Sequence, residues 1–419
     1  MLLLSGCSGY TSGVADLIVP PKLTVEQKEI LQVVEKSIGE NIKLKYPREG
    51  SFRSPIIMKD IDQNGQPEAI VLYAPFSIDA NKIPNVRINL LSKNKGQWES
   101  VSSVEGGGSN IDQIDFVPFS DVLKYDLFVS YTSINESEKL FVQYTYESGK
   151  LSAGFSERHV AFGTMDYGDK ITQSLILIRK DNLEKKAYAG LYRFTGIQAE
   201  KLGETEINYN TSRYLPIHQN VFPDFTALIY IDAMANEDYI TEILKFNDKG
   251  FSKLYKGQSG YNDFLRKENI SCADIDGDGL YEVPTSTYLP LPVNRPEYSN
   301  KISLVSWYKP EDVPRMVKTG YYSVSFGYTV EMGGDFPQNI TARMNYKKNE
   351  ITFVNYNPQT KAPGEDIFSI KVLSEKEKKT DEIAGFVELE SKNGLTYYAK
   401  IDRSDQVSLE KLIQIFNVL

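Results

Sequence analysis

Carboxylate side chains recur at alternate positions of one short segment: Asp274, Asp276, Asp278 and Glu282. They occupy positions 1, 3, 5 and 9 of a predicted tight loop, and the carbonyl oxygen of Leu280 at position 7 is available as a further ligand. Gly279 stands where such a loop needs a backbone angle that residues with a Cβ resist. Because hard cations prefer oxygen ligands arranged around a sharp turn, the segment predicts a calcium site.

A second acidic segment far upstream repeats this pattern in weaker form, with the candidate ligands Asp60, Asp62, Asn64, Gln66 and Glu68. Asn64 replaces one charge, so we expect the Asp274 segment to bind calcium more tightly. Asp, Asn and Gly also favour turns without any metal, through bonds from side chain to backbone, and this alternative stays open for both segments.

Neither segment is an EF-hand, because that motif requires a glutamate at position 12 on a following helix. Position 12 is Val71 in one loop and Thr285 in the other, and residues 69–73 are β-branched and aromatic, which is typical of a strand. A metal loop that joins two strands and ends on a carboxylate at position 9 resembles the calcium hairpins of FG-GAP and VCBS-type repeats in integrin-like β-propellers. The resemblance implies a β-propeller and bound Ca²⁺, although the Phe-Gly…Gly-Ala-Pro signature is absent.

Short alternating strands separated by turn residues follow from about residue 51 and form a repeat. Three units of four strands are predicted at 55–59, 69–74, 86–92 and 97–104; at 112–119, 125–131, 139–147 and 150–156; and at 159–165, 173–179, 187–194 and 197–207. A fourth unit spans about 225–255, and a fifth contains the Asp274 loop and residues 301–307. Units that start roughly 50–60 residues apart favour a propeller over a β-sandwich.

The predicted fold class is therefore mainly β, a propeller of four-stranded blades followed by a small α+β C-terminal domain. The expected divisions are a signal remnant and tether at 1–21, a helix within 22–48, the propeller at 49–310 and the C-terminal domain at 315–419, with a linker at 309–314. Thr24 and Gln27 form a predicted capping box for the first helix, and Ser408 is the predicted N-cap of the last helix.

The first residues end in Leu-Ser-Gly-Cys7, which closely matches the bacterial lipobox. We expect Cys7 to carry a diacylglycerol that anchors the chain to the outer face of a cell membrane. The missing basic region before it indicates a start codon assigned too late or a shortened chain. Cys272 would then be the single unmodified thiol and is expected to be packed and inert.

Composition and motifs narrow the classes of function that the sequence allows. A net charge of −9 argues against nucleic acid as a partner. The sequence has two histidines and shows no nucleophile motif, phosphate loop or HExxH. The main expectation is a calcium-binding lipoprotein with a non-catalytic role, bound to the bilayer through Cys7 and to an unknown extracellular ligand or envelope protein. The alternatives are a propeller hydrolase or lyase that acts on extracellular glycans, and a structural protein of envelope assembly.

Overall fold

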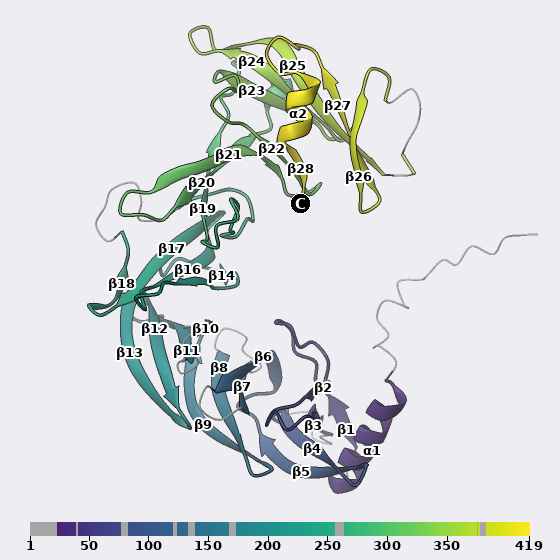
Figure 1. Ribbon diagram of the computed structural model, residues 1–419, viewed down its shortest axis with the longest axis vertical. Helices are drawn as coiled ribbons and strands as arrows, with labels where there is room; N and C mark the ends of the chain where they lie inside the picture. Colours follow the sequence, from purple (N-terminus) through teal and green to yellow (C-terminus); the bar gives the residue numbers. More distant parts are fainter. Residues whose placement is uncertain are drawn as a thin grey trace, which may run out of the picture. The chain divides into compact units, whose positions relative to one another are not determined.

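The computed structural model describes residues 23–38, 41–76, 83–119, 124–132, 139–166, 173–255, 264–374, 376–377 and 383–419. Over these residues the chain is mainly β, and its strands form six antiparallel sheets (Figure 1). The chain divides into two compact units: residues 1–160, 169–173 and 193–200 form the first, and residues 161–168, 174–192 and 201–419 form the second. The predicted mainly β class is thus confirmed.

The first sheet carries one of the acidic loops. It contains β1 (Ile42–Leu44), β2 (Ile56–Lys59), β3 (Glu68–Pro75), β4 (Arg87–Asn94) and β5 (Gln97–Glu105). Its order is β1-β3-β4-β5, with β2 also paired to β3. Helix α1 (Val25–Ile38) buries Ile30 and Val34 against this sheet. The predicted capping box is confirmed, since Thr24 Oγ1 accepts from the Gln27 N–H and Gln27 Oε1 accepts from the Thr24 N–H.

The second sheet of the first unit follows the order of the sequence. It consists of β6 (Asn110–Phe119), β7 (Lys124–Thr132), β8 (Lys139–Glu147) and β9 (Lys150–His159). Alternating residues such as Ile114, Leu127 and Val129 are fully buried and share one apolar core with Ile70 and Leu72 of the first sheet. The other face of these strands carries the buried aromatic rings of Phe128 and Phe141 together with polar side chains, which are described below.

Two sheets open the second unit. One has the order β10-β11-β12-β13, from β10 (Ala161–Asp166), β11 (Gln173–Asp181), β12 (Lys186–Thr195) and β13 (Gln198–Ile207). The other has the order β14-β16-β17-β18, from β14 (Arg213–Tyr214), β16 (Ala227–Ala235), β17 (Asp238–Asn247) and β18 (Gly250–Lys253), and β15 (His218–Val221) also pairs with β16. The predicted strands of the first three units thus coincide with observed strands, with ends shifted by a few residues.

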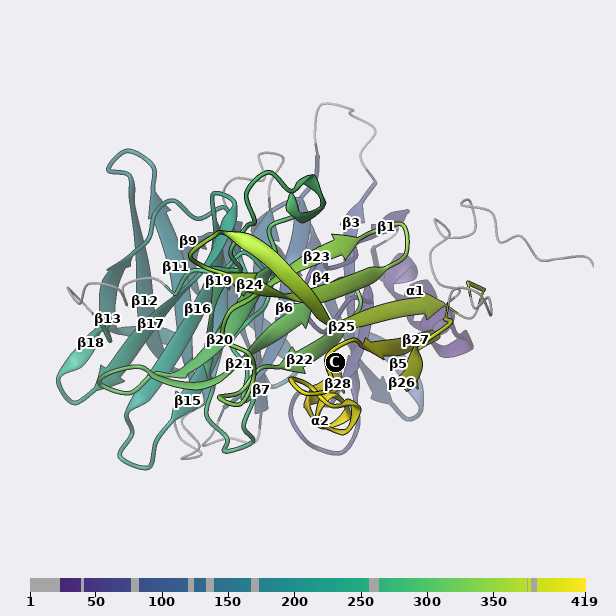
Figure 2. The ribbon, with the colours of Figure 1, turned by 90° about the horizontal axis from the view of Figure 1, so that it is seen from above.

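The last two sheets share one apolar core. The order β19-β20-β21-β22-β28 joins β19 (Val283–Tyr288), β20 (Ser303–Lys309), β21 (Arg315–Ser323), β22 (Tyr328–Glu331) and β28 (Phe416–Val418). The order β23-β24-β25-β27-β26 joins β23 (Ile340–Asn345), β24 (Glu350–Asn357), β25 (Ala362–Ser374), β26 (Val387–Lys392) and β27 (Leu395–Ile401). Helix α2 (Leu409–Ile415), seen from above in Figure 2, starts at Ser408, whose side chain caps Lys411 N as predicted.

The structure corrects the linker expected at residues 309–314. Lys309 pairs with Arg315, so this segment is the turn of the β20–β21 hairpin inside one sheet. Pro314 lies in that turn, where its missing N–H costs no ladder hydrogen bond. The next strands, β21 and β22, also form a hairpin, joined by a turn at Gly327 with φ +63°.

Candidate functional site

The two acidic loops share one backbone frame. Asp274 Oδ2 accepts from Gly279 N at 2.9 Å, and its Oδ1 accepts from Asp278 N at 3.1 Å. Asp60 binds the equivalent residues, since its Oδ2 accepts from Gly65 N at 2.8 Å and its Oδ1 accepts from Asn64 N at 3.0 Å. In both loops the carboxylate at position 1 therefore holds the turn around positions 5 and 6.

Positions 4 and 6 of both loops have positive φ. The values are +55° at Gln63, +90° at Gly65, +79° at Gly277 and +87° at Gly279. A Cβ at Gly65 or Gly279 would meet no atom within 4 Å, so the backbone angle is the reason for glycine at position 6. The predicted role of Gly279 is thus confirmed.

The glutamate at position 9 is the buried member of each loop. Glu68 is 3% exposed and Glu282 is fully buried. The Oε2 atom of each accepts a hydrogen bond of 2.9 Å from the backbone N–H at position 2, which is Ile61 or Ile275. Burial is the main cause that raises the pKa of both glutamates, and the neighbouring aspartates raise it further.

Each loop brings three carboxylates together. One oxygen from each of Asp60, Asp62 and Glu68 lies within 4.8 Å of the others, and the same holds for Asp274, Asp276 and Glu282. The predicted ligands at position 5 are used differently, because their side chains cap the N–H at position 7: Asn64 bonds to Gln66 N at 2.8 Å and Asp278 to Leu280 N at 3.0 Å. In each loop the structure thus brings together the carboxylates at positions 1, 3 and 9 of the predicted ligand set, but not the side chain at position 5.

These donor sets fit a hard cation. Glu282 Oε1 is buried and accepts no hydrogen bond from any residue that the structure describes. A buried carboxylate oxygen beside two further carboxylates is electrostatically costly unless a positive charge compensates it, and in the Asp274 loop the Lys309 ammonium supplies part of that charge. The chemistry of the set, oxygen atoms only, is the one that Ca²⁺ prefers.

A lysine that sequence reasoning missed reaches into the Asp274 loop. Lys309 Nζ lies 2.8 Å from Asp276 Oδ2, pairs with Asp278 Oδ2, and lies 3.9 Å from Glu282 Oε1. The hydrogen bonds to Asp276 and Asp278 raise the pKa of Lys309 well above its usual range. Lys309 reaches the loop because β19 and β20 pair with Val283 opposite Tyr308. Among the described residues, no lysine or arginine makes such an ion pair with the Asp60 loop.

Two carboxyls with raised pKa lie on the face of the β6–β9 sheet that is opposite to the core shared with the first sheet. Asp126 is 5% exposed, and burial raises its pKa to about 7 although Gln143 donates a hydrogen bond to it. Burial also raises the pKa of Asp115, which accepts from Gln113 Nε2 at 2.6 Å. Asp126 pairs with Val117, two residues from Asp115, so strand alternation places both carboxyls on the same face as diagonal neighbours.

A serine and a histidine also meet in this sheet, between Ser130 Oγ and His159 Nε2 at 3.0 Å. Both side chains are buried, and burial lowers the pKa of His159 to about 3. The two side chains meet across β8, which separates β7 from β9, so we assign this contact to packing on one face of the sheet.

Of the two cysteines, the structure describes Cys272 and not Cys7. Cys7 lies outside the described residues, so its lipidation stays a prediction. Cys272 is 3% exposed, and burial raises the pKa of its thiol well above the usual value, as expected for an inert thiol. No helix in the described part of the chain has the length and apolar character needed to span a bilayer.

Comparison with known proteins gives only weak similarities. No family model and no curated protein matches the chain. Among solved structures, a Dyadobacter fermentans protein of unknown function is 10% identical, with 86% of this chain and 98% of the other covered and a TM-score of 0.32. A Bacillus licheniformis rhamnogalacturonan lyase is 13% identical (87% and 74% covered, TM-score 0.31). A Fusarium graminearum α-L-arabinofuranosidase is 10% identical (77% and 95% covered, TM-score 0.30).

These names correct the main functional expectation. The similar structures whose names state an activity are enzymes that act on glycans, so they agree with the enzyme alternative and not with the expected non-catalytic role. TM-scores near 0.3 carry no argument for a fold or an activity of this chain. Any activity must therefore be argued from the chain's own residues.

Proposed function

We propose that the protein binds two calcium ions, one in each acidic loop. The observation that carries the proposal is the identical frame of the two loops, in which a buried glutamate and two aspartates gather their oxygens around one point. Bound Ca²⁺ supplies a positive charge that compensates these carboxylates. One ion would join the end of β2 to the start of β3, and the other would stiffen the turn closed by the bridge between Ala273 and Glu282, just before β19.

The number of charges sets the affinity. Exposed loops with three or four carboxylates are typical of extracellular modules, which bind Ca²⁺ with dissociation constants of about 0.1–1 mM. At roughly 1 mM free calcium, each site then adds about 0.4–1.4 kcal/mol to the free energy of unfolding. Calcium is therefore expected to stabilise the fold without being required for it.

Equilibrium dialysis with radioactive calcium tests this proposal. We expect two bound ions per chain, and one after either Asp276→Ala or Asp62→Ala. Asp248→Ala is the matched control, because it removes an exposed carboxylate from a turn outside both loops. Unchanged stoichiometry in both loop variants, or no bound calcium in the wild type, would show that the loops are turns without metal.

A second candidate function is cleavage of glycans, as a hydrolase or a lyase. The observation that favours it is the pair Asp126 and Asp115, two carboxyls on one sheet face whose pKa values are raised by burial. A carboxyl group that is still protonated near neutral pH can act as a general acid, and glycosidases use two carboxyls near the scissile bond. This second candidate also includes the proposal that the sheets are arranged as the blades of a propeller.

The pH dependence of activity tests the second candidate. Asp126 donates a proton only while it is protonated, so activity on arabinan, galactan or rhamnogalacturonan should fall as the pH rises above about 7. Asp126→Asn should lower kcat by at least about a hundredfold, whereas Asp248→Asn should not change it. Activity that survives Asp126→Asn would remove Asp126 from the reaction, and no activity on any of the three glycans would reject the candidate.

A further inference from the structure

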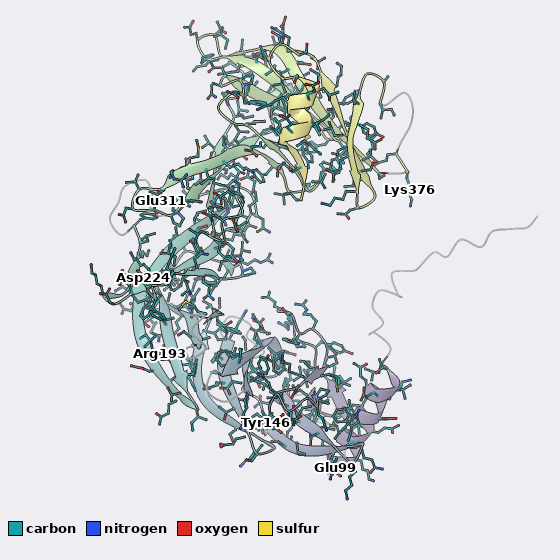
Figure 3. The ribbon with its side chains drawn as sticks, viewed as in Figure 1. Glu99, Tyr146, Arg193, Asp224, Glu311 and Lys376 are labelled. Atoms are coloured by element: carbon teal, nitrogen blue, oxygen red, sulfur yellow. The ribbon has the colours of Figure 1, made fainter. Side chains whose placement is uncertain are left out.

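A pocket of about 530 Å³ lies beside the β23–β27 sheet, where the β23–β24 turn approaches the end of β25. Its most common lining residue is lysine, in a chain whose net charge is −9. The five lysines are Lys347, Lys348, Lys371, Lys376 (labelled in Figure 3) and Lys400. Five lysines around one pocket form a local concentration of positive charge in an acidic protein.

The carboxylates of the pocket are already engaged. Glu350 Oε2 pairs with Lys371 Nζ at 3.0 Å. Glu377 Oε2 accepts two hydrogen bonds from Ser374, from the backbone N–H at 2.9 Å and from Oγ at 2.7 Å. Glu350 is thus engaged with Lys371, and Glu377 offsets only part of the charge of the remaining lysines, because the pocket has five lysines and two carboxylates.

Three of the five lysines have no counter-ion among the residues that the structure describes. Lys400 pairs with Asp402 at 2.7 Å, and Lys371 with Glu350. Lys347, Lys348 and Lys376 are exposed and make no ion pair with a residue that the structure describes. Their uncompensated charge makes the pocket attractive to an anion.

One wall of the pocket is aromatic. Phe386 lines it, and the Lys371 ammonium lies 4.5 Å from the centre of the Phe386 ring. Lys371 is 5% exposed and holds the Phe386 ring through this cation–π contact. Lys347, Lys348 and Lys376 are exposed to solvent. A volume of about 530 Å³ lies within the range of small-molecule sites. The pocket thus offers cations for a charged group and an apolar face for the rest of a ligand.

We propose that this pocket binds an anionic sugar, that is, a sugar ring that carries a carboxylate or a phosphate. The lysines bind the anionic group, and Phe386 packs against the C–H face of the ring. A simple inorganic anion would use only the lysines, and a neutral sugar only the aromatic wall. The inference is independent of the calcium loops and of the carboxyl pair Asp115 and Asp126.

Calorimetry on the full chain tests the proposal with four probes: trigalacturonate, glucose 6-phosphate, neutral galactotriose and inorganic phosphate. At least one of the two anionic sugars should bind about tenfold more tightly than both galactotriose and inorganic phosphate, and its affinity should fall with added salt. Whichever of the two binds identifies the anionic group as a carboxylate or a phosphate.

Variants locate the binding. The double change Lys347→Glu and Lys348→Glu should weaken binding at least about tenfold. The matched control is Lys150→Glu with Lys249→Glu, which makes the same change in net charge at two exposed positions, the start of β9 and the turn between β17 and β18. Phe386→Ser should remove the preference for a sugar anion over inorganic phosphate. The proposal would be overturned by an equal loss of affinity in the control variant or by an equal affinity of the wild type for inorganic phosphate. It would also be overturned if neither anionic sugar bound.

Discussion

Replacing Arg266 by methionine should lower the free energy of unfolding of the second unit by about 3–5 kcal/mol, because the change leaves Asp232 as a buried, unpaired charge. Both side chains are fully buried, and Arg266 Nη2 lies 2.7 Å from Asp232 Oδ1. Arg266 Nη1 also donates to Thr241 Oγ1 at 2.8 Å, and Asp232 Oδ2 accepts from Cys272 N at 2.9 Å. One ion pair therefore joins β16, β17 and the segment that leads into the Asp274 loop.

Urea denaturation of single and double variants measures this effect. Arg266→Met combined with Asp232→Leu removes both charges, so it should recover much of the loss. Lys267→Met is the matched control, because solvent screens the exposed pair of Lys267 and Asp238 and its loss should hardly change the free energy of unfolding. A loss for Arg266→Met as small as that of the control would contradict the prediction.

The second large effect concerns calcium affinity. Lys309→Met should tighten Ca²⁺ binding to the Asp274 loop by about tenfold, because the lysine ammonium competes with the ion for Asp276 and Asp278. The methionine keeps the aliphatic part of the side chain and removes only the charge. The Asp60 loop, which pairs with no described lysine or arginine, should keep its affinity.

Calcium titration of Lys309→Met beside the wild type measures this change, and Lys318→Met, from an ion pair with Glu331 on the neighbouring strand, is the control. In the Asp62→Ala background only the Asp274 loop remains, so its affinity can be read directly. Equal affinities of Lys309→Met and wild type would mean that the ammonium leaves the loop freely when calcium arrives.

This predicted competition would also change the order of affinities expected from sequence. Asp278 gives the downstream loop one more charge than Asn64 gives the upstream loop, and the ion pair of Asp278 with Lys309 would offset that charge. The sequence could not show it, because Lys309 is distant from the loop in the chain and reaches it only through the pairing of β19 with β20. The loops themselves were predictable because each is a local motif whose Asp, Gly and Glu act within nine residues.

The same distinction applies to the fold. Most strands were predicted, since alternation of apolar residues and turn signals are local. The β20–β21 hairpin was mistaken for a linker because Pro314 and the charges around it are equally typical of both. The lysine pocket was missed because Lys347, Lys371 and Lys400 come from three separate parts of the chain that meet only in the sheet.

The pairing of β28 with β22 has a consequence for biosynthesis. Tyr328 lies opposite Val418, so the sheet that begins at β19 gains its last strand from residues made about ninety positions later. A nascent chain that has emerged as far as β27 still presents β22 as an open edge, which can pair with other chains. Completion of this sheet must therefore wait until the ribosome has released almost the whole second unit, and until then the segment depends on protection from aggregation.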